Sequence, residues 1–132
     1  MKYPTISVVI PTYNSAKTLA QCLQSVRVQL YPQKKIEIIL SDGGSSDDTF
    51  ALARAYGAKV ISVDKTKQGA EYNRAVGAHR AKHDILLFVD HDNVLPHKGW
   101  MRYMVAPFIK DKTIIGVETL RYTYDPADSL IG

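Results

Sequence analysis

The stretch ISVVIPTYN, residues 6–14, joins an apolar run to a polar end, and this pairing recurs along the chain. The run 6–10 is short and rich in β-branched residues, which predicts a buried strand that stops at Pro11. Outward from it, further strands are expected at 36–40, 59–63, 84–90 and 114–118, the one at 84–90 being apolar throughout and therefore central. Helix-periodic segments lie between these strands, at residues 19–30, 47–56, 69–81 and 100–109. The alternation predicts an α/β fold in which a largely parallel sheet carries helices on both faces.

Length and composition fit a single domain, residues 1–132, with an ordinary hydrophobic content of 45%. The net charge of +4 suits an anionic small ligand, a nucleic acid or an anionic membrane surface, and does not choose among them. The single cysteine, Cys22, excludes an intrachain disulfide. The apolar run 85–89 is too short to span a bilayer. We therefore expect a cytoplasmic domain.

Polar clusters follow the expected strands at 6–10, 36–40 and 84–90. Ligands of open α/β sheets bind beyond the carboxyl ends of the strands, so these clusters are expected to form one site. Asp90 and Asp92 stand two residues apart after an apolar strand, and carboxylates of this kind hold Mg²⁺ or Mn²⁺ beside substrate phosphates. Asp-x-Asp is also common in solvated acidic turns. His91 is expected to face away from its two neighbours and to be packed or hydrogen-bonded.

Asp42 closes the second strand before two glycines, which let the backbone approach a ligand. A carboxylate there can accept a hydrogen bond from a ring N–H of uracil or guanine, although a turn rich in glycine and serine is the alternative. Asp47 and Asp48 are expected to cap the following helix, as Asn14 or Ser15 caps the first one.

Four segments together resemble the motifs of family 2 glycosyltransferases with the GT-A fold. SVVIPTYN (7–14) resembles the opening motif, DGGSSDDT (42–49) the motif D-D-G-S-x-D-x-T, and residues 69–81 the helix G-x-x-x-x-R-N-x-G-x-x-x-A. VDHDN (89–93) resembles the D-x-D signature. The resemblance implies a Rossmann-like α/β/α sandwich with a mostly parallel central sheet.

The resemblance also implies a role for each matching residue. Nucleoside contacts would come from Pro11, Thr12, Tyr13 and Asp42. Arg74 would face the base or the phosphates, Asp90 the ribose and the metal, and Asp92 would be the main ligand of Mg²⁺ or Mn²⁺. The implied reaction is inverting transfer of a sugar from a UDP- or GDP-type donor to a glycan or lipid-carrier acceptor, with no role for nucleic acid.

The chain departs from the family pattern in three places. Gly43 stands where a second Asp is usual, and Ala75 where Asn is usual. No Q-x-x-R-W motif follows Asp92, and Glu118, at the end of an expected strand, does not suit a catalytic base. We therefore expect a C-terminally truncated chain that binds donor, with the base beyond Gly132. Any association with the cytosolic face of a membrane would come from the missing regions.

Two other functions compete with a transferase. A non-catalytic nucleotide-sugar-binding module would carry the same motifs without a base. A haloacid-dehalogenase-like phosphatase uses D-x-D-x-[TV], which 90–94 matches, with the first Asp as nucleophile; that motif normally opens its fold, however. A Rossmann dinucleotide-binding domain is disfavoured because no G-x-G-x-x-G follows the first strand.

Overall fold

The computed structural model describes residues 2–118 and confirms the α/β architecture. The strands are β1 (Ile6–Thr12), β2 (Ile36–Asp42), β3 (Lys59–Ser62) and β4 (Ile85–Phe88). The helices are α1 (Ala16–Arg27), α2 (Thr49–Ala55), α3 (Ala70–Arg80) and α4 (Trp100–Lys110), with a 3-10 turn η1 (Gln33–Lys35) before β2. None of the helices in this part of the chain is both long and apolar enough to cross a membrane.

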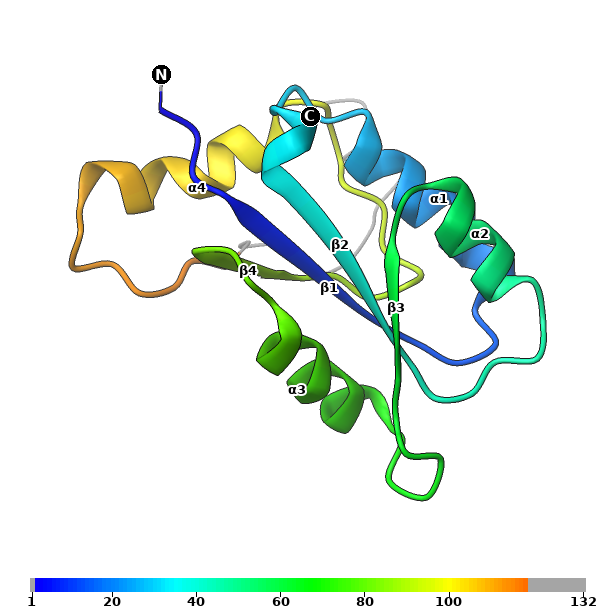
Figure 1. Cartoon of the computed structure of the whole chain (residues 1–132). Helices are drawn as coiled ribbons and strands as arrows, with labels where there is room; N and C mark the ends of the chain where they lie inside the picture. The colour runs from blue at the N-terminus through cyan, green and yellow to red at the C-terminus, as the bar shows by residue number, and fades with distance from the viewer. Residues whose placement is uncertain (1, 119–132) are drawn as a thin grey trace.

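The strands form one parallel sheet in the order β3-β2-β1-β4 (Figure 1). From β1 the chain steps outward to β2 and β3, and it then crosses to the other side of β1 to add β4. The direction of winding therefore reverses between β1 and β4. A reversal of this kind leaves a crevice at the carboxyl ends of the two strands, which is where ligands bind in open α/β sheets.

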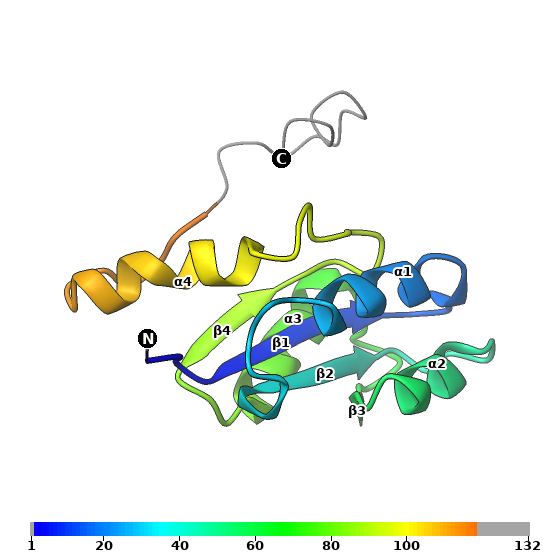
Figure 2. The same cartoon turned by 90° about the horizontal axis from the view of Figure 1, so that it is seen from above.

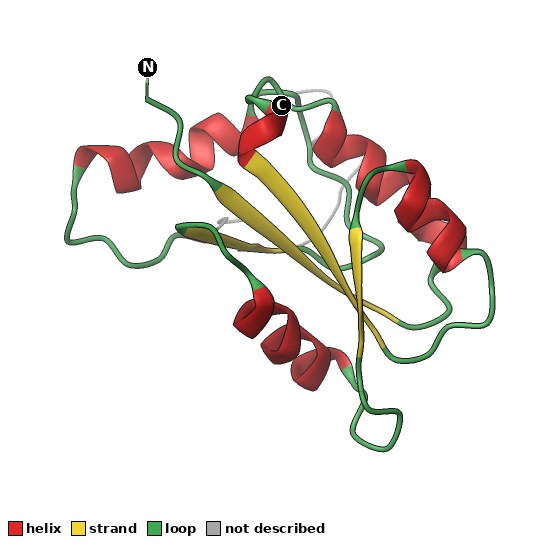
Figure 3. Ribbon diagram, in the orientation of Figure 1, coloured by secondary structure: helices red, strands yellow, loops and turns green. Residues whose placement is uncertain are grey.

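The main core lies on the sheet face that α1 and α4 cover, as seen from above in Figure 2. It joins Ile10 and Leu40 of the sheet to Leu23 of α1 and Met101 of α4, all of them buried. Helix α3 covers the opposite face (Figure 3). It packs closely there, because a Cβ added to Gly77 would lie 2.4 Å from Val9 Cγ1.

The strands differ from the sequence expectation in three respects. β1 continues through Pro11 to Thr12, paired with β2, after β4 has left its other side at Val9. A proline is tolerated there because a missing N–H matters less where only one neighbouring strand remains. The expectation of a central strand at 84–90 is wrong within the described residues, since β4 lies at the edge of the sheet. The expected strand at 114–118 is also absent from the structure.

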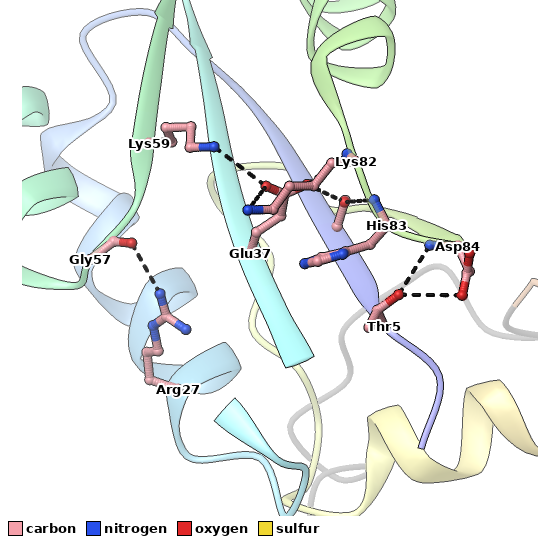
Figure 4. A network of polar contacts seen from close by, with 9 residues as sticks. Thr5, Arg27, Glu37, Gly57, Lys59, Lys82, His83 and Asp84 are labelled. Carbon is pink, nitrogen blue, oxygen red and sulfur yellow. Dashed lines mark hydrogen bonds and ion pairs between the residues drawn. The ribbon is translucent and has the colours of Figure 1, made fainter. Parts of the chain in front are cut away.

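A polar network at the amino ends of the strands fastens the α3–β4 connection to the sheet (Figure 4). The partly buried carboxylate of Glu37 on β2 accepts hydrogen bonds from Ser7 Oγ at 2.5 Å and from Lys82 N at 2.8 Å. Lys59 Nζ lies 3.7 Å from the second carboxylate oxygen. Burial raises the pKa of Glu37, but the hydrogen bonds and the positive charges of His83 and Lys59 outweigh it and leave the pKa below its ordinary value.

Candidate functional site

The loops that follow β1 and β2 run side by side (Figure 3), and hydrogen bonds tie them together. Asn14, with φ of 49°, donates its backbone N–H to Ser45 Oγ at 2.7 Å, and its side-chain oxygen accepts from Ser46 N at 2.8 Å. Ser15 N donates to Thr49 Oγ1 at 3.0 Å. The serines and threonine of the second motif therefore hold the polar end of the first motif in place.

Asp42 is the centre of this arrangement. Its side chain is buried, with 1% exposed, and accepts four hydrogen bonds. Oδ1 accepts from Thr12 Oγ1 at 2.7 Å and from Ser45 Oγ at 2.6 Å; Oδ2 accepts from the backbone N–H groups of Gly44 at 2.8 Å and Ser45 at 2.7 Å. A carboxylate offers about four lone-pair positions, and all are used. The structure thus gives Asp42 a turn-forming role, and its contact with a nucleobase stays a prediction.

Asp47 links the starts of two helices. Its Oδ1 accepts from Thr49 N at 3.0 Å, at the start of α2, while its Oδ2 accepts from Ala16 N at 3.0 Å, at the start of α1. Asp48 and Ser15 occupy the positions before these helices, but neither side chain makes a capping bond. The capping that was expected within each loop is therefore supplied in part across the two loops.

A pocket of about 340 Å³ opens beside these loops, at the crevice between β1 and β4. It gathers the end of β1, the start of α3 and the loop that follows β4. The lining residues are Pro11, Thr12, Tyr13, Gln68, Gly69, Ala70, Asn73, Arg74, Asp90, His91 and Asp92. Six of the seven residues predicted to bind the donor or the metal therefore meet at one pocket, and Asp42 lies behind them.

The acidic side of the pocket carries an ion pair and a second carboxylate. Arg74 Nη2 lies 2.9 Å from Asp90 Oδ1, so the helix α3 guanidinium sits beside the first Asp of the D-x-D segment. Asp92 is exposed, and no hydrogen bond or ion pair engages its carboxylate within the described residues. No group of three His, Cys, Asp or Glu side chains in residues 2–118 is arranged to hold a metal. A cation here would rely on the two carboxylates together with phosphate oxygens and water, which suits Mg²⁺ or Mn²⁺.

Helix α1 supports the D-x-D segment from behind. His91 Nδ1 lies 2.8 Å from Thr18 Oγ1, and Cys22 Sγ donates to the carbonyl oxygen of Asp90 at 3.5 Å. His91 is hydrogen-bonded, as expected, and it is also among the residues that line the pocket. Burial, followed by the negative charges of Asp92 and Asp90, raises the pKa of the Cys22 thiol to about 12. The thiol is therefore a neutral packing group.

Sequence reasoning missed Gln68 and Asn73. Asn73 is 2% exposed; its side-chain oxygen accepts from Gly69 N at 3.2 Å, and its Nδ2 donates to Ser41 O at 3.3 Å. It thereby fixes the start of α3 against β2. An asparagine inside a helical pattern was the available signal. Gln68 lies in an irregular loop, where no periodicity marks it.

Comparison with known proteins places the chain in a family. The model described as "Glycosyl transferase family 2" matches residues 7–129. Glycosyltransferase AglE of Haloferax volcanii is 37% identical over 107 residues, which cover 78% of this chain and 35% of that protein. The chain thus spans about a third of that relative.

Solved structures of glycosyltransferases superpose on this chain. Staphylococcus aureus TarS 1-349 in complex with UDP superposes with a TM-score of 0.74 at 28% identity, over 80% of this chain and 32% of that one. The mannosyltransferase PcManGT from Pyrobaculum calidifontis, in complex with GDP-Man and Mn²⁺, superposes with a TM-score of 0.63 at 25% identity, over 74% of this chain and 30% of that one. The fold is that of GT-A glycosyltransferases, and the chain belongs to glycosyl transferase family 2.

Proposed function

We propose that this chain is the donor-binding part of an inverting, metal-dependent glycosyltransferase that uses a UDP- or GDP-sugar. The observation that carries the proposal is the pocket at the winding reversal of the sheet. Tyr13, which is 52% exposed, lines the pocket from the loop after β1, and Asp90 and Asp92 line it from the loop after β4. An aromatic ring suits a nucleobase, and a pair of carboxylates suits a metal-bound diphosphate. Solved structures similar to this chain contain UDP, or GDP-Man with Mn²⁺.

Each residue on the acidic side has a distinct proposed task. The free carboxylate of Asp92 would be the main ligand of Mg²⁺ or Mn²⁺, and Asp90 would contribute its oxygen that Arg74 does not engage. The ion pair with Asp90 supports a place for Arg74 beside the phosphates, at a distance from the base. When bound, the cation would neutralise charge on the departing diphosphate. Without it, the carboxylates and the phosphates would repel one another.

The catalytic base is expected elsewhere. In the described part of the chain, Asp90 and Asp92 are the only carboxylates that line the pocket, and both are assigned to the metal side. Deprotonation of an acceptor hydroxyl needs a further group within hydrogen-bond reach. We therefore propose that the base and the acceptor site, for a glycan or a lipid carrier, belong to a region outside residues 2–118. The winding order also disfavours the phosphatase alternative, whose motif opens its fold, since here Asp90 follows β4.

Calorimetric titration of the chain with UDP and GDP tests the proposal, in the presence of Mn²⁺ and after chelation. We expect at least one nucleotide to bind only with the metal. Asp92→Ala should weaken that binding by at least about tenfold. Asp48→Ala is the matched control, because Asp48 is exposed and lies outside the pocket. Binding that survives both chelation and Asp92→Ala would remove the metal from the proposal.

A further inference from the structure

Among residues 2–118, no carboxylate beside Thr12 and Tyr13 is free to bind a nucleobase. The carboxylate oxygens of Asp42 already accept four hydrogen bonds, three from the turn between β2 and α2 and one from Thr12. Gly43, the next residue, has no side chain. Thr12 already donates its hydroxyl to Asp42 at 2.7 Å. A polar group for hydrogen bonding to the base must therefore come from another segment.

The side chain of Gln68 supplies such a polar group, next to Gly43 and Thr12. A Cβ built on Gly43 would lie 2.5 Å from Gln68 Oε1 and 3.1 Å from Gln68 Cβ, so the glutamine lies directly over the glycine. Gly43 N in turn donates to Thr12 O at 2.9 Å, which places the carboxamide beside the end of β1. Gln68 lines the pocket together with Thr12 and Tyr13. Within residues 2–118 no hydrogen bond engages its side chain, so the amide is open to a ligand.

The chemistry of the amide favours one kind of base. A carboxamide presents an acceptor and a donor side by side in one plane. The edge of uracil offers an N3–H donor between two carbonyl acceptors, so the amide can satisfy one donor and one acceptor at once. Guanine offers one acceptor, O6, beside two neighbouring donors, N1–H and the N2 amine, and a carboxylate would match the two donors. An amide can pair with O6 and N1–H, but the N2 amine then stays unpaired where uracil leaves only a carbonyl oxygen. An orphaned buried N–H is tolerated less well than an under-satisfied carbonyl, so the amide favours uracil.

We propose that Gln68 is the residue that reads the nucleobase, and that it makes this a uridine-type donor site. The inference rests on the proposed nucleotide-sugar function and specifies its base. Selectivity then depends on a neutral amide from the β3–α3 connection lying over Gly43. The aromatic ring of Tyr13 contributes to either base and does not choose between them.

The test compares UDP and GDP affinities by calorimetry in excess Mn²⁺, for the unaltered chain and for Gln68→Glu. We expect the unaltered chain to bind UDP about tenfold more tightly than GDP, the cost of one unpaired donor. Gln68→Glu replaces the donor with a second acceptor and should move the UDP-to-GDP affinity ratio at least about tenfold toward GDP. The added negative charge lies near the same diphosphate in both ligands, so its effect cancels in the ratio.

Two further variants serve as a control and as an independent check. Gln24→Glu introduces the same charge on the exposed side of α1, outside the pocket, and should leave the ratio unchanged. The double variant Gly43→Asp with Gln68→Ala places a carboxylate at position 43, in the loop after β2. The second substitution removes the glutamine side chain with which an aspartate at position 43 would clash. The double variant should shift the ratio toward GDP in the same direction as Gln68→Glu.

The outcomes separate this inference from the function on which it rests. Suppose that UDP binds in a metal-dependent way while Gln68→Glu changes the UDP-to-GDP affinity ratio by less than about twofold. That result would overturn the role of Gln68 and leave the proposed donor site intact. Tighter binding of GDP than UDP by the unaltered chain would overturn the role of Gln68 as well. If neither nucleotide binds, both proposals fall.

Discussion

Replacement of Asp42 by asparagine separates a turn-forming role from a nucleobase contact. The side chain keeps its size but exchanges one acceptor oxygen for an NH₂ group. In the structure both carboxylate oxygens accept two hydrogen bonds each, at 2.6–2.8 Å. Whichever way the amide is turned, two of these four donors lose their acceptor and meet a donor instead. The site is 1% exposed, so water cannot readily replace the lost bonds.

The expected cost follows from those two lost bonds. A buried donor left without its partner costs about 1–3 kcal/mol, and the effects of neighbouring bonds are not fully additive. We expect Asp42→Asn to lower the free energy of unfolding by about 2–4 kcal/mol, which is a large share of the roughly 5–15 kcal/mol typical of a domain. Nucleotide affinity should fall with it, because the loop that carries Tyr13 is tied to this turn.

Urea unfolding gives the free energy, and amide hydrogen exchange at Ser45, whose N–H donates to Asp42, reports the turn itself. Asp48→Asn is the control: it makes the same chemical change in the same loop, but at an exposed side chain with no capping bond. A variant with unchanged stability and unchanged Ser45 exchange, but with weakened UDP binding, would refute the turn-forming role. Asp42 would then be a direct ligand of the base.

Three other changes have defined outcomes. Gly77→Ala places a methyl group 2.4 Å from a β1 side chain and should cost about 1–3 kcal/mol of unfolding free energy in urea, while Gly116→Ala, with nothing within 4 Å, should cost far less. Glu37→Gln should cost about 1.5–3 kcal/mol near neutral pH. Because the folded-state pKa of Glu37 is lowered, its stabilisation is present above the unfolded pKa and is lost as the pH falls through the folded pKa, so the two unfolding curves should converge in acid. Thr18→Val removes the hydrogen-bond partner of His91, so it should weaken Mn²⁺-dependent UDP binding by about threefold to tenfold, and Thr18→Ser should restore the affinity. If calorimetry gives Thr18→Val and the unaltered chain equal UDP affinities, the Thr18–His91 contact does not support the site.

The sequence predicted the order of elements well because the signals involved are local. Apolar runs and helical periodicity placed β1 to β4 and α1 to α4 within a few residues of their bounds. The position of β4 was not predictable in the same way. Its residues are apolar throughout, yet Leu86 and Phe88 are 42% and 48% exposed within the described structure. Burial depends on which strands and helices cover a segment, and no run of residues within that segment encodes this.

The candidate site shows the same division. Strand ends converge because parallel strands share an edge, so the meeting of Thr12, Arg74 and Asp92 at one pocket could be predicted. The hydrogen-bond partners of each side chain could not be predicted. Asp42 turned inward because four donors from its own turn and from β1 surround it, and Gln68 faces the pocket because Gly43 leaves room for it. The placement of Gln68 depends on a contact between segments that are distant in sequence, and Asp42 combines one such contact, with Thr12, with three contacts inside its own turn.

The second motif therefore has two separable tasks, and this changes how a departure within it is understood. If the motif served only to bind the ligand, Gly43 would mark a loss of function at that position. In the structure the remaining motif residues Asp42, Ser45 and Thr49 still hold the loops together, so the site keeps its shape without an acidic side chain at 43. The glycine then creates the space that Gln68 fills. A departure from the pattern at this position changes which group faces the ligand and leaves the loop framework intact, which makes selectivity the property expected to vary.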